Sequence, residues 1–101
     1  MTERAVIAGD TYILLTLQKG DYYPAGILRE IGQITKREPF SRRYLDRLLK
    51  NMSEDGLVEK REQLKGRRRF YGITPEGRKH LMFDMDQIGL AFAYYQETIG
   101  E

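Results

Sequence analysis

The sequence predicts a mainly α-helical fold of the α+β class, in which three short helices precede one small β-hairpin and a long last helix. Before residue 56, apolar residues recur at helical spacing in two segments, and a third, earlier segment is apolar on nearly all sides. Two short strand-like runs follow, with a glycine between them. Thr74-Pro75-Glu76 then combines a capping hydroxyl, a first-turn proline and a carboxylate, which together favour a helix start. A length of 101 residues suits one domain with a modest core.

The first two helices are expected at residues 11–19 and 24–34. Asp10 suits the N-cap of the first helix, and Gly20 ends it. Because this helix is apolar on nearly all sides, we expect it to be buried. Pro24 suits the first turn of the second helix. The second helix has one apolar face with a 3.6-residue period, formed by Ile27, Leu28, Ile31 and Ile34.

The third helix is expected to follow Ser41 as its N-cap and to extend to Asp55. Gly56 stands where a helix C-terminal glycine belongs. The apolar stripe of this helix repeats at i, i+3, i+4 and i+7. It consists of Leu45, Leu48, Leu49 and Met52.

Two strands are expected at residues 57–63 and 68–73, with a turn at Lys65-Gly66 because glycine accepts a positive φ. The last helix is expected at residues 75–99. Three helices, a two-stranded hairpin and a long C-terminal helix form the winged helix-turn-helix arrangement, in which the hairpin is the wing. Caps, periods and turn all agree with it.

The near-neutral net charge of +2 conceals a polarised chain. Residues 29–80 hold 15 of the 17 basic residues and 8 acidic residues, a local charge of +7. Residues 81–101 hold four acidic residues and no basic residue. The middle of the chain therefore suits an anionic partner, whereas the last helix suits neither DNA nor an anionic membrane.

The third helix is the candidate recognition helix. With its apolar stripe turned to the core, Arg43, Arg47 and Lys50 fall on the opposite face, and arginine in a major groove can pair with both O6 and N7 of guanine. A solvated helix face is the alternative interpretation. The residues that we expect to contact DNA are Ser41, Arg42, Arg43, Tyr44, Arg47, Lys50 and Asn51.

The turn of the hairpin is the second candidate DNA contact, because clustered cations on one loop favour a nearby phosphate backbone or a narrow minor groove. A solubilising loop is the alternative. The wing residues concerned are Lys65, Gly66, Arg67, Arg68 and Arg69. Lys36 and Arg37, before the recognition helix, are further candidates for backbone contacts.

The last helix carries a heptad-like apolar seam with spacings of 4, 3, 4, 3 and 4 residues, formed by Leu81, Met85, Ile88, Phe92, Tyr95 and Ile99. A helix of roughly 35 Å overhangs so small a body, so we expect this seam to pack on a second subunit. Packing against the first helix of the same chain is the alternative, and both can hold at different points. We therefore divide the single domain into a DNA-binding region, residues 1–74, and a dimerisation helix, residues 75–101.

Four aromatic residues of the last helix allow a pocket for a small, flat aromatic effector between subunits, although aromatics at helical spacing more often form a core. They are Phe83, Phe92, Tyr94 and Tyr95.

Several function classes find no support in the residues. The chain has no Cys, which excludes disulfides, thiolate zinc sites and a cysteine nucleophile. His80 is the only histidine, and Asp84 four residues later gives at best a poor two-residue site for a metal or a general base, so we interpret His80 as a helix-surface or interface residue. No apolar run reaches the ~20 residues that span a bilayer. We expect no enzyme activity, no cofactor, no metal and no membrane contact, and a cytoplasmic location.

Two motifs of the chain resemble those of the PadR-like winged-helix transcription regulators. Asp55-Gly56-Leu57 follows the recognition helix, and Arg68-Arg69-Phe70-Tyr71-Gly72-Ile73-Thr74-Pro75-Glu76-Gly77 opens the last helix, a start whose threonine and glycine MarR-like regulators share. The resemblance covers about residues 10–99. It implies a homodimeric DNA-binding repressor, in some members released by a small phenolic or drug-like ligand.

Together these observations predict a sequence-specific DNA-binding regulator, a homodimeric repressor of a pseudo-palindromic operator on double-stranded DNA. Two alternatives stay open at this point. One is an architectural protein that binds DNA without sequence preference. The other is a winged-helix module that binds a protein instead of nucleic acid.

Overall fold

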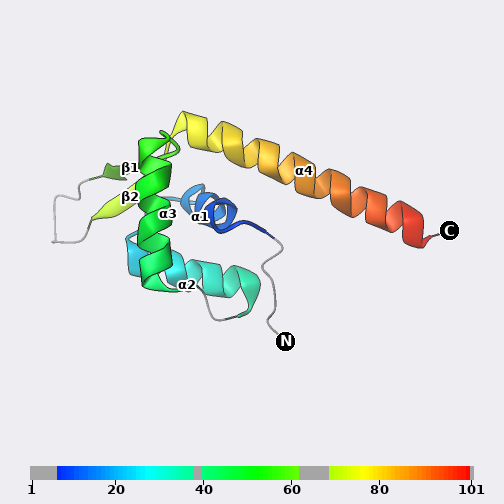
Figure 1. Ribbon diagram of the computed structural model, residues 1–101, viewed down its shortest axis with the longest axis horizontal. Coiled ribbons are helices and arrows are strands. Elements are labelled where there is room, and N and C mark those ends of the chain that lie inside the picture. Colours follow the sequence, from blue (N-terminus) through cyan, green and yellow to red (C-terminus); the bar gives the residue numbers. More distant parts are fainter. Residues whose placement is uncertain (1–6, 38–39, 62–68, 101) are drawn as a thin grey trace.

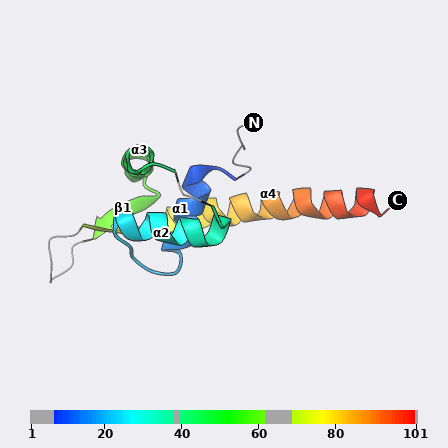
Figure 2. The same cartoon turned by 90° about the horizontal axis from the view of Figure 1, so that it is seen from below.

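The computed structural model describes residues 7–37, 40–61 and 69–100. In chain order its elements are α1 (Gly9–Leu17), α2 (Pro24–Thr35), α3 (Arg42–Glu54), β1 (Val58–Arg61), β2 (Phe70–Ile73) and α4 (Pro75–Ile99). Helices α1 to α3 gather beside the hairpin, and α4 projects away from them (Figure 1). Seen from below, α4 and the hairpin extend in opposite directions (Figure 2). The mainly helical winged-helix fold is confirmed.

One hydrophobic core joins all of these elements. It includes Ile13, Leu14 and Leu17 of α1, Ile27 and Ile31 of α2, Leu45, Leu49 and Met52 of α3, Val58, Ile73, and Leu81 of α4. The predicted stripes of α2 and α3 supply five of these eleven residues, with Leu28 and Leu48 half-buried at the edge of the core. Ile34 is the exception, because it lies in the last turn of α2 with 44% of its surface exposed.

Helix α1 is buried as expected, but its predicted start was wrong. The N-cap is Ala8, whose carbonyl accepts from the N–H groups of Thr11 and Tyr12, and Asp10 lies inside the first turn. Gly9 explains the earlier start, since a Cβ there would lie 2.9 Å from Leu48 Cδ1. The absence of a side chain at Gly9 thus lets the first turn of α1 approach α3 closely.

Helices α3 and α4 begin as the sequence predicts. The Ser41 hydroxyl accepts from the Tyr44 N–H at 3.1 Å, and the Thr74 hydroxyl accepts from the Gly77 N–H at 3.0 Å. Thr74 also donates to the Gly56 carbonyl at 2.6 Å, and Gly56 itself has a φ of 77°. Thr74 therefore caps α4 and also ties the start of α4 to the turn that ends α3.

The hairpin is antiparallel, with Val58 opposite Ile73 and Arg61 opposite Phe70. Its strands are shorter than predicted in their described parts, and the turn itself, residues 62–68, lies outside the described residues. A contact that we had not predicted extends the sheet. Tyr22 and Tyr71 exchange two backbone hydrogen bonds of 3.1 and 2.9 Å, which attach the segment before α2 to β2.

Candidate nucleic-acid interface

The outward face of α3 carries three exposed cations opposite the core. Arg43 and Lys50 have no ion pair or hydrogen bond to another residue in the described part of the chain. The guanidinium of Arg47 lies 5.9 Å from the Tyr44 ring centroid, in a cation–π contact. Because no carboxylate among the described residues pairs with these three groups, their charge is available to an anionic partner.

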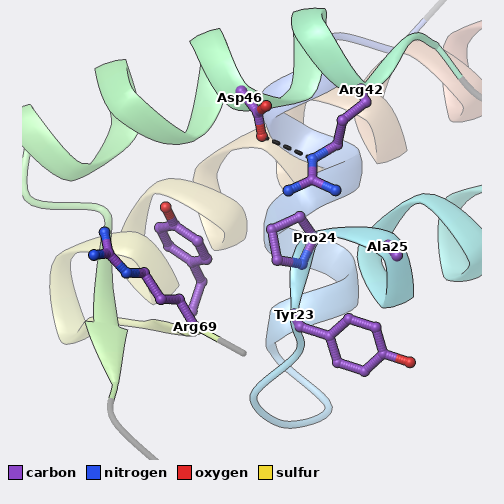
Figure 3. Close-up of a pocket in the computed structure, with 7 residues that line it drawn as sticks. Tyr23, Pro24, Ala25, Arg42, Asp46 and Arg69 are labelled. Carbon is purple, nitrogen blue, oxygen red and sulfur yellow. Dashed lines mark hydrogen bonds and ion pairs between the residues drawn. The ribbon is translucent and has the colours of Figure 1, made fainter. Parts of the chain in front are cut away.

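Arg42 is placed differently from these three cations. Its Nε donates to Asp46 Oδ1 at 2.9 Å, one helical turn away. Both side chains lie at a hollow of about 460 Å³ between α3, the start of α2 and β2. Arg69, the residue before β2, lines the same hollow (Figure 3). Asp46 therefore directs Arg42 toward the gap between the helix and the wing.

Of the other residues predicted to contact DNA at α3, some support the fold and one is only exposed to solvent. The Ser41 hydroxyl is engaged as the cap. The Tyr44 ring packs edge-on against Phe40, with centroids 5.0 Å apart, and keeps 38% of its surface exposed. Asn51 is exposed. Tyr44 thus supports the contact of α3 with α1 and the segment before α3, a role that the helical period did not reveal.

Of the predicted wing residues, Lys65, Gly66, Arg67 and Arg68 lie outside the described residues, and Arg69 is exposed at the base of the hairpin. That base is held by Arg61, which donates to Asp21 Oδ1 at 2.8 Å, Glu59 Oε1 at 3.0 Å and the Ile73 carbonyl at 3.0 Å. The hydrogen bond to Glu59, with the charge of Asp21, raises the pKa of Arg61 above its ordinary value.

We had not predicted this role of Arg61 from the sequence. The signal was present in Gly72, since a glycine inside a strand often marks the close approach of another group. Here the guanidinium of Arg61 occupies the space that a Cβ of residue 72 would fill.

Lys36 and Arg37 lie at the end of α2. Lys36 is its left-handed C-cap, with a φ of 58°. Arg37 lines a groove along α4, together with Ile88, Phe92 and Tyr95. The structure therefore does not bring Arg37 together with the exposed cations of α3.

The seam of α4 divides into a packed part and an exposed part. Leu81 is buried and Met85 is half-buried against the core. The next four seam residues, Ile88, Phe92, Tyr95 and Ile99, are 37–62% exposed. The start of the seam thus packs on its own chain, and its later residues are exposed among the described residues. Packing of these later residues on a second subunit stays a prediction.

Of the four aromatics proposed for an effector pocket, Phe92 and Tyr95 line the groove beside α4, which has a volume of about 560 Å³. Phe83 and Tyr94 are exposed and do not line it. A small aromatic effector stays a prediction.

His80 lies 43% exposed on α4, with Nε2 3.7 Å from Asp84 Oδ2. In residues 7–37, 40–61 and 69–100, His and acidic side chains form no cluster that could hold a metal ion. No helix of that part is both long and apolar enough to cross a bilayer.

The model of the transcriptional regulator PadR-like family matches residues 13–82, from α1 into the first turns of α4. The chain belongs to the PadR-like family. PadR-like proteins are transcription regulators and not enzymes, so this one is a DNA-binding regulator of transcription.

Solved structures resemble this PadR-like regulator over nearly its whole length. A transcriptional regulator from Clostridium thermocellum is 25% identical, with 91% of this chain and 97% of that chain covered and a TM-score of 0.76. RosR of H. salinarum is 27% identical, with 95% and 91% covered and a TM-score of 0.71. A PadR family regulator from Clostridium difficile R20291, 21% identical, covers 89% and 96% with a TM-score of 0.77 and supports the fold. No curated protein matches the sequence.

Proposed function

We propose that this PadR-like regulator is a homodimeric, sequence-specific repressor that places α3 in the major groove of a pseudo-palindromic operator. The observation that carries the proposal is the charge on α3. Arg43, Arg47 and Lys50 are exposed, point away from the core and lack a carboxylate partner among the described residues. The repressor role rests on the resemblance to the family.

The two regions of the chain have different functions in this proposal. Residues 1–74 bind DNA, with α3 reading bases and the wing, Lys65–Arg69, lying against the adjoining backbone or minor groove. Residues 75–101 pair the subunits, because the exposed seam of α4 is apolar and residues 81–101 carry no cation. We expect such a regulator in the cytoplasm, where bacterial or archaeal DNA would be accessible to it.

Selection of bound sequences from random duplex DNA tests the function. We expect two related half-sites in inverted orientation, about 34–36 Å or a multiple of this apart. Competition should then show a preference of ~10³ or more over random DNA. Equal binding to all sequences would favour the architectural protein, and no binding to duplex DNA at low salt would favour the protein-interaction module.

Arg43→Ala is expected to relax base preference at one operator position in each half-site, at a cost of ~1–3 kcal/mol, if its fork pairs with guanine. Arg43→Lys is the matched control, since it keeps the charge but loses the bidentate fork. We expect Arg43→Lys to lose the same base preference while the salt dependence of binding is unchanged. Equal preference in all three proteins, measured by competition with operator variants, would contradict a base contact by Arg43.

Replacement of Arg67, Arg68 and Arg69 by Ala is expected to weaken binding to all sequences alike. If each subunit neutralises about four phosphates, log K should fall with log salt with a slope near −7 for the dimer. Loss of three cations per subunit should flatten this slope by about five. Titrations of operator and random DNA at several salt concentrations measure both effects, and an unchanged slope would remove the wing from the interface.

A further inference from the structure

A side-chain hydrogen bond joins α4 to α1 at the point where α4 leaves the body. The Thr11 hydroxyl, on a residue only 4% exposed, donates to Asp84 Oδ2 at 2.8 Å. Leu81 and Met85 pack against the core on either side of Asp84 along the helix. From residue 86 to residue 100 every side chain of the chain is exposed. The Thr11–Asp84 bond therefore lies at the last packed turn of α4.

The length of α4 beyond this bond makes its direction sensitive to small changes there. From Asp84 to Ile99 the helix continues for about 22 Å, at 1.5 Å per residue. A rotation of about 10° at Asp84 would displace the end of α4 by about 4 Å. In a dimer paired through α4, each subunit contributes such a displacement, and the two copies of α3 move apart or together.

A hydrogen bond restricts this angle in a way that the neighbouring apolar contacts do not. Hydrophobic packing is non-directional, so the contacts of Leu81 and Met85 tolerate rotation. A hydroxyl–carboxylate bond is short, strong and directional. Rotation of α4 would also leave the buried Thr11 hydroxyl without a partner, which is costly. His80 Nε2 is 3.7 Å from the same carboxylate oxygen, beyond hydrogen-bond distance, and on α4 itself.

We infer that Thr11 and Asp84 are positioning residues that fix the angle between α4 and the winged-helix body and so set the half-site spacing of the operator. The part that concerns spacing rests on the proposed dimeric function. Neither residue contacts DNA in this proposal. Their effect reaches the operator only through the distance and rotation between the two α3 helices.

Distance measurement between spin labels tests the angle without DNA. Because the chain has no Cys, Glu54→Cys on α3 and Glu97→Cys on α4 give two unique labels. The labelled protein is mixed with an excess of unlabelled protein, so that a dimer holds at most one labelled subunit and the measured distances lie within that subunit. We compare Thr11→Val, which keeps the shape and loses the hydroxyl, with Thr11→Ser, which keeps it. Asp84→Ala is compared with Asp86→Ala, an exposed carboxylate two residues away.

We expect Thr11→Val and Asp84→Ala to shift or broaden the distance distribution by about 4 Å, and Thr11→Ser and Asp86→Ala to leave it unchanged. Circular dichroism checks that each protein is folded. Because Thr11→Val and Asp84→Ala are independent substitutions, misfolding of one variant still leaves the other to test the inference. A distribution for Thr11→Val identical to that for Thr11→Ser would overturn the inference.

Binding to operators with altered spacers tests the second step. The unsubstituted chain and Thr11→Ser should lose about tenfold in affinity when one base pair is added or removed, whereas Thr11→Val should lose less than about threefold. A spacing preference retained in full by Thr11→Val would overturn the link to the operator. If the label distances change but the unsubstituted chain selects no paired half-sites, the dimeric function fails while the role of the bond in the angle stands.

Discussion

Gly77→Ala should destabilise the fold by about 3 kcal/mol, the largest effect on stability that we expect from one added methyl group. Gly77 lies in the first turn of α4, where a Cβ would overlap the Leu57 carbonyl oxygen and would lie 2.8 Å from Ile73 Cγ1. A carbonyl in the main chain cannot turn aside as a flexible side chain can. Relief requires α4 to move away from the hairpin. Thermal unfolding should show a Tm lower by roughly 12–24 °C.

Gly89→Ala is the matched control, because it makes the same change in the same helix. No atom lies within 4 Å of the Cβ position of residue 89. Alanine favours a helix by about 1 kcal/mol over glycine, so the control should be more stable. The two variants therefore have opposite expected signs. A Gly77→Ala protein as stable as the unsubstituted chain would contradict the close approach of α4 to Leu57.

Gly77 also shows which parts of the fold were predictable. Its place after Thr74-Pro75-Glu76 was visible as a motif, but the reason for a glycine is the carbonyl of Leu57, twenty residues earlier. The caps Ser41 and Thr74 were predicted correctly because a cap and its N–H partner lie within three residues. The cap at Asp10 was wrong because tertiary contact with α3 sets the start of α1.

In the candidate site too, contacts between residues close in sequence were predictable and contacts between distant residues were not. The exposed face of α3 follows from helical periodicity, which is local information. The pairing of Arg42 with Asp46 has the i,i+4 spacing that a sequence can reveal. The contact of Arg61 with Asp21 joins residues forty positions apart, and the Tyr22–Tyr71 bridge joins residues even further apart. Periodicity carries no information on such pairs.

Phe92→Glu should abolish dimerisation and, with it, tight operator binding. Phe92 is 59% exposed in the single chain, so a polar residue there should leave the monomer folded. In a two-fold dimer the substitution removes two buried rings, each worth roughly 1.5–3 kcal/mol, and introduces two like charges into one seam. We expect the dimer dissociation constant to rise by at least about 100-fold, measured by analytical ultracentrifugation. The operator should lose the ~10²–10⁴-fold advantage of two linked half-sites, while affinity for one half-site is unchanged.

Leu90→Glu is the control that distinguishes loss of a seam residue from loss of any exposed apolar side chain on α4. Leu90 is 66% exposed, close to the value for Phe92, but two positions along a helix place it on the opposite face. In a monomer, Phe92→Glu and Leu90→Glu should behave alike. In a dimer paired through the seam they should differ, because the dimer covers Phe92 and leaves Leu90 in solvent. We therefore expect Leu90→Glu to dimerise and bind the operator like the unsubstituted protein. If Leu90→Glu dissociates and Phe92→Glu does not, the subunits pair through the other face of α4, and the heptad spacing has identified the wrong side of the helix.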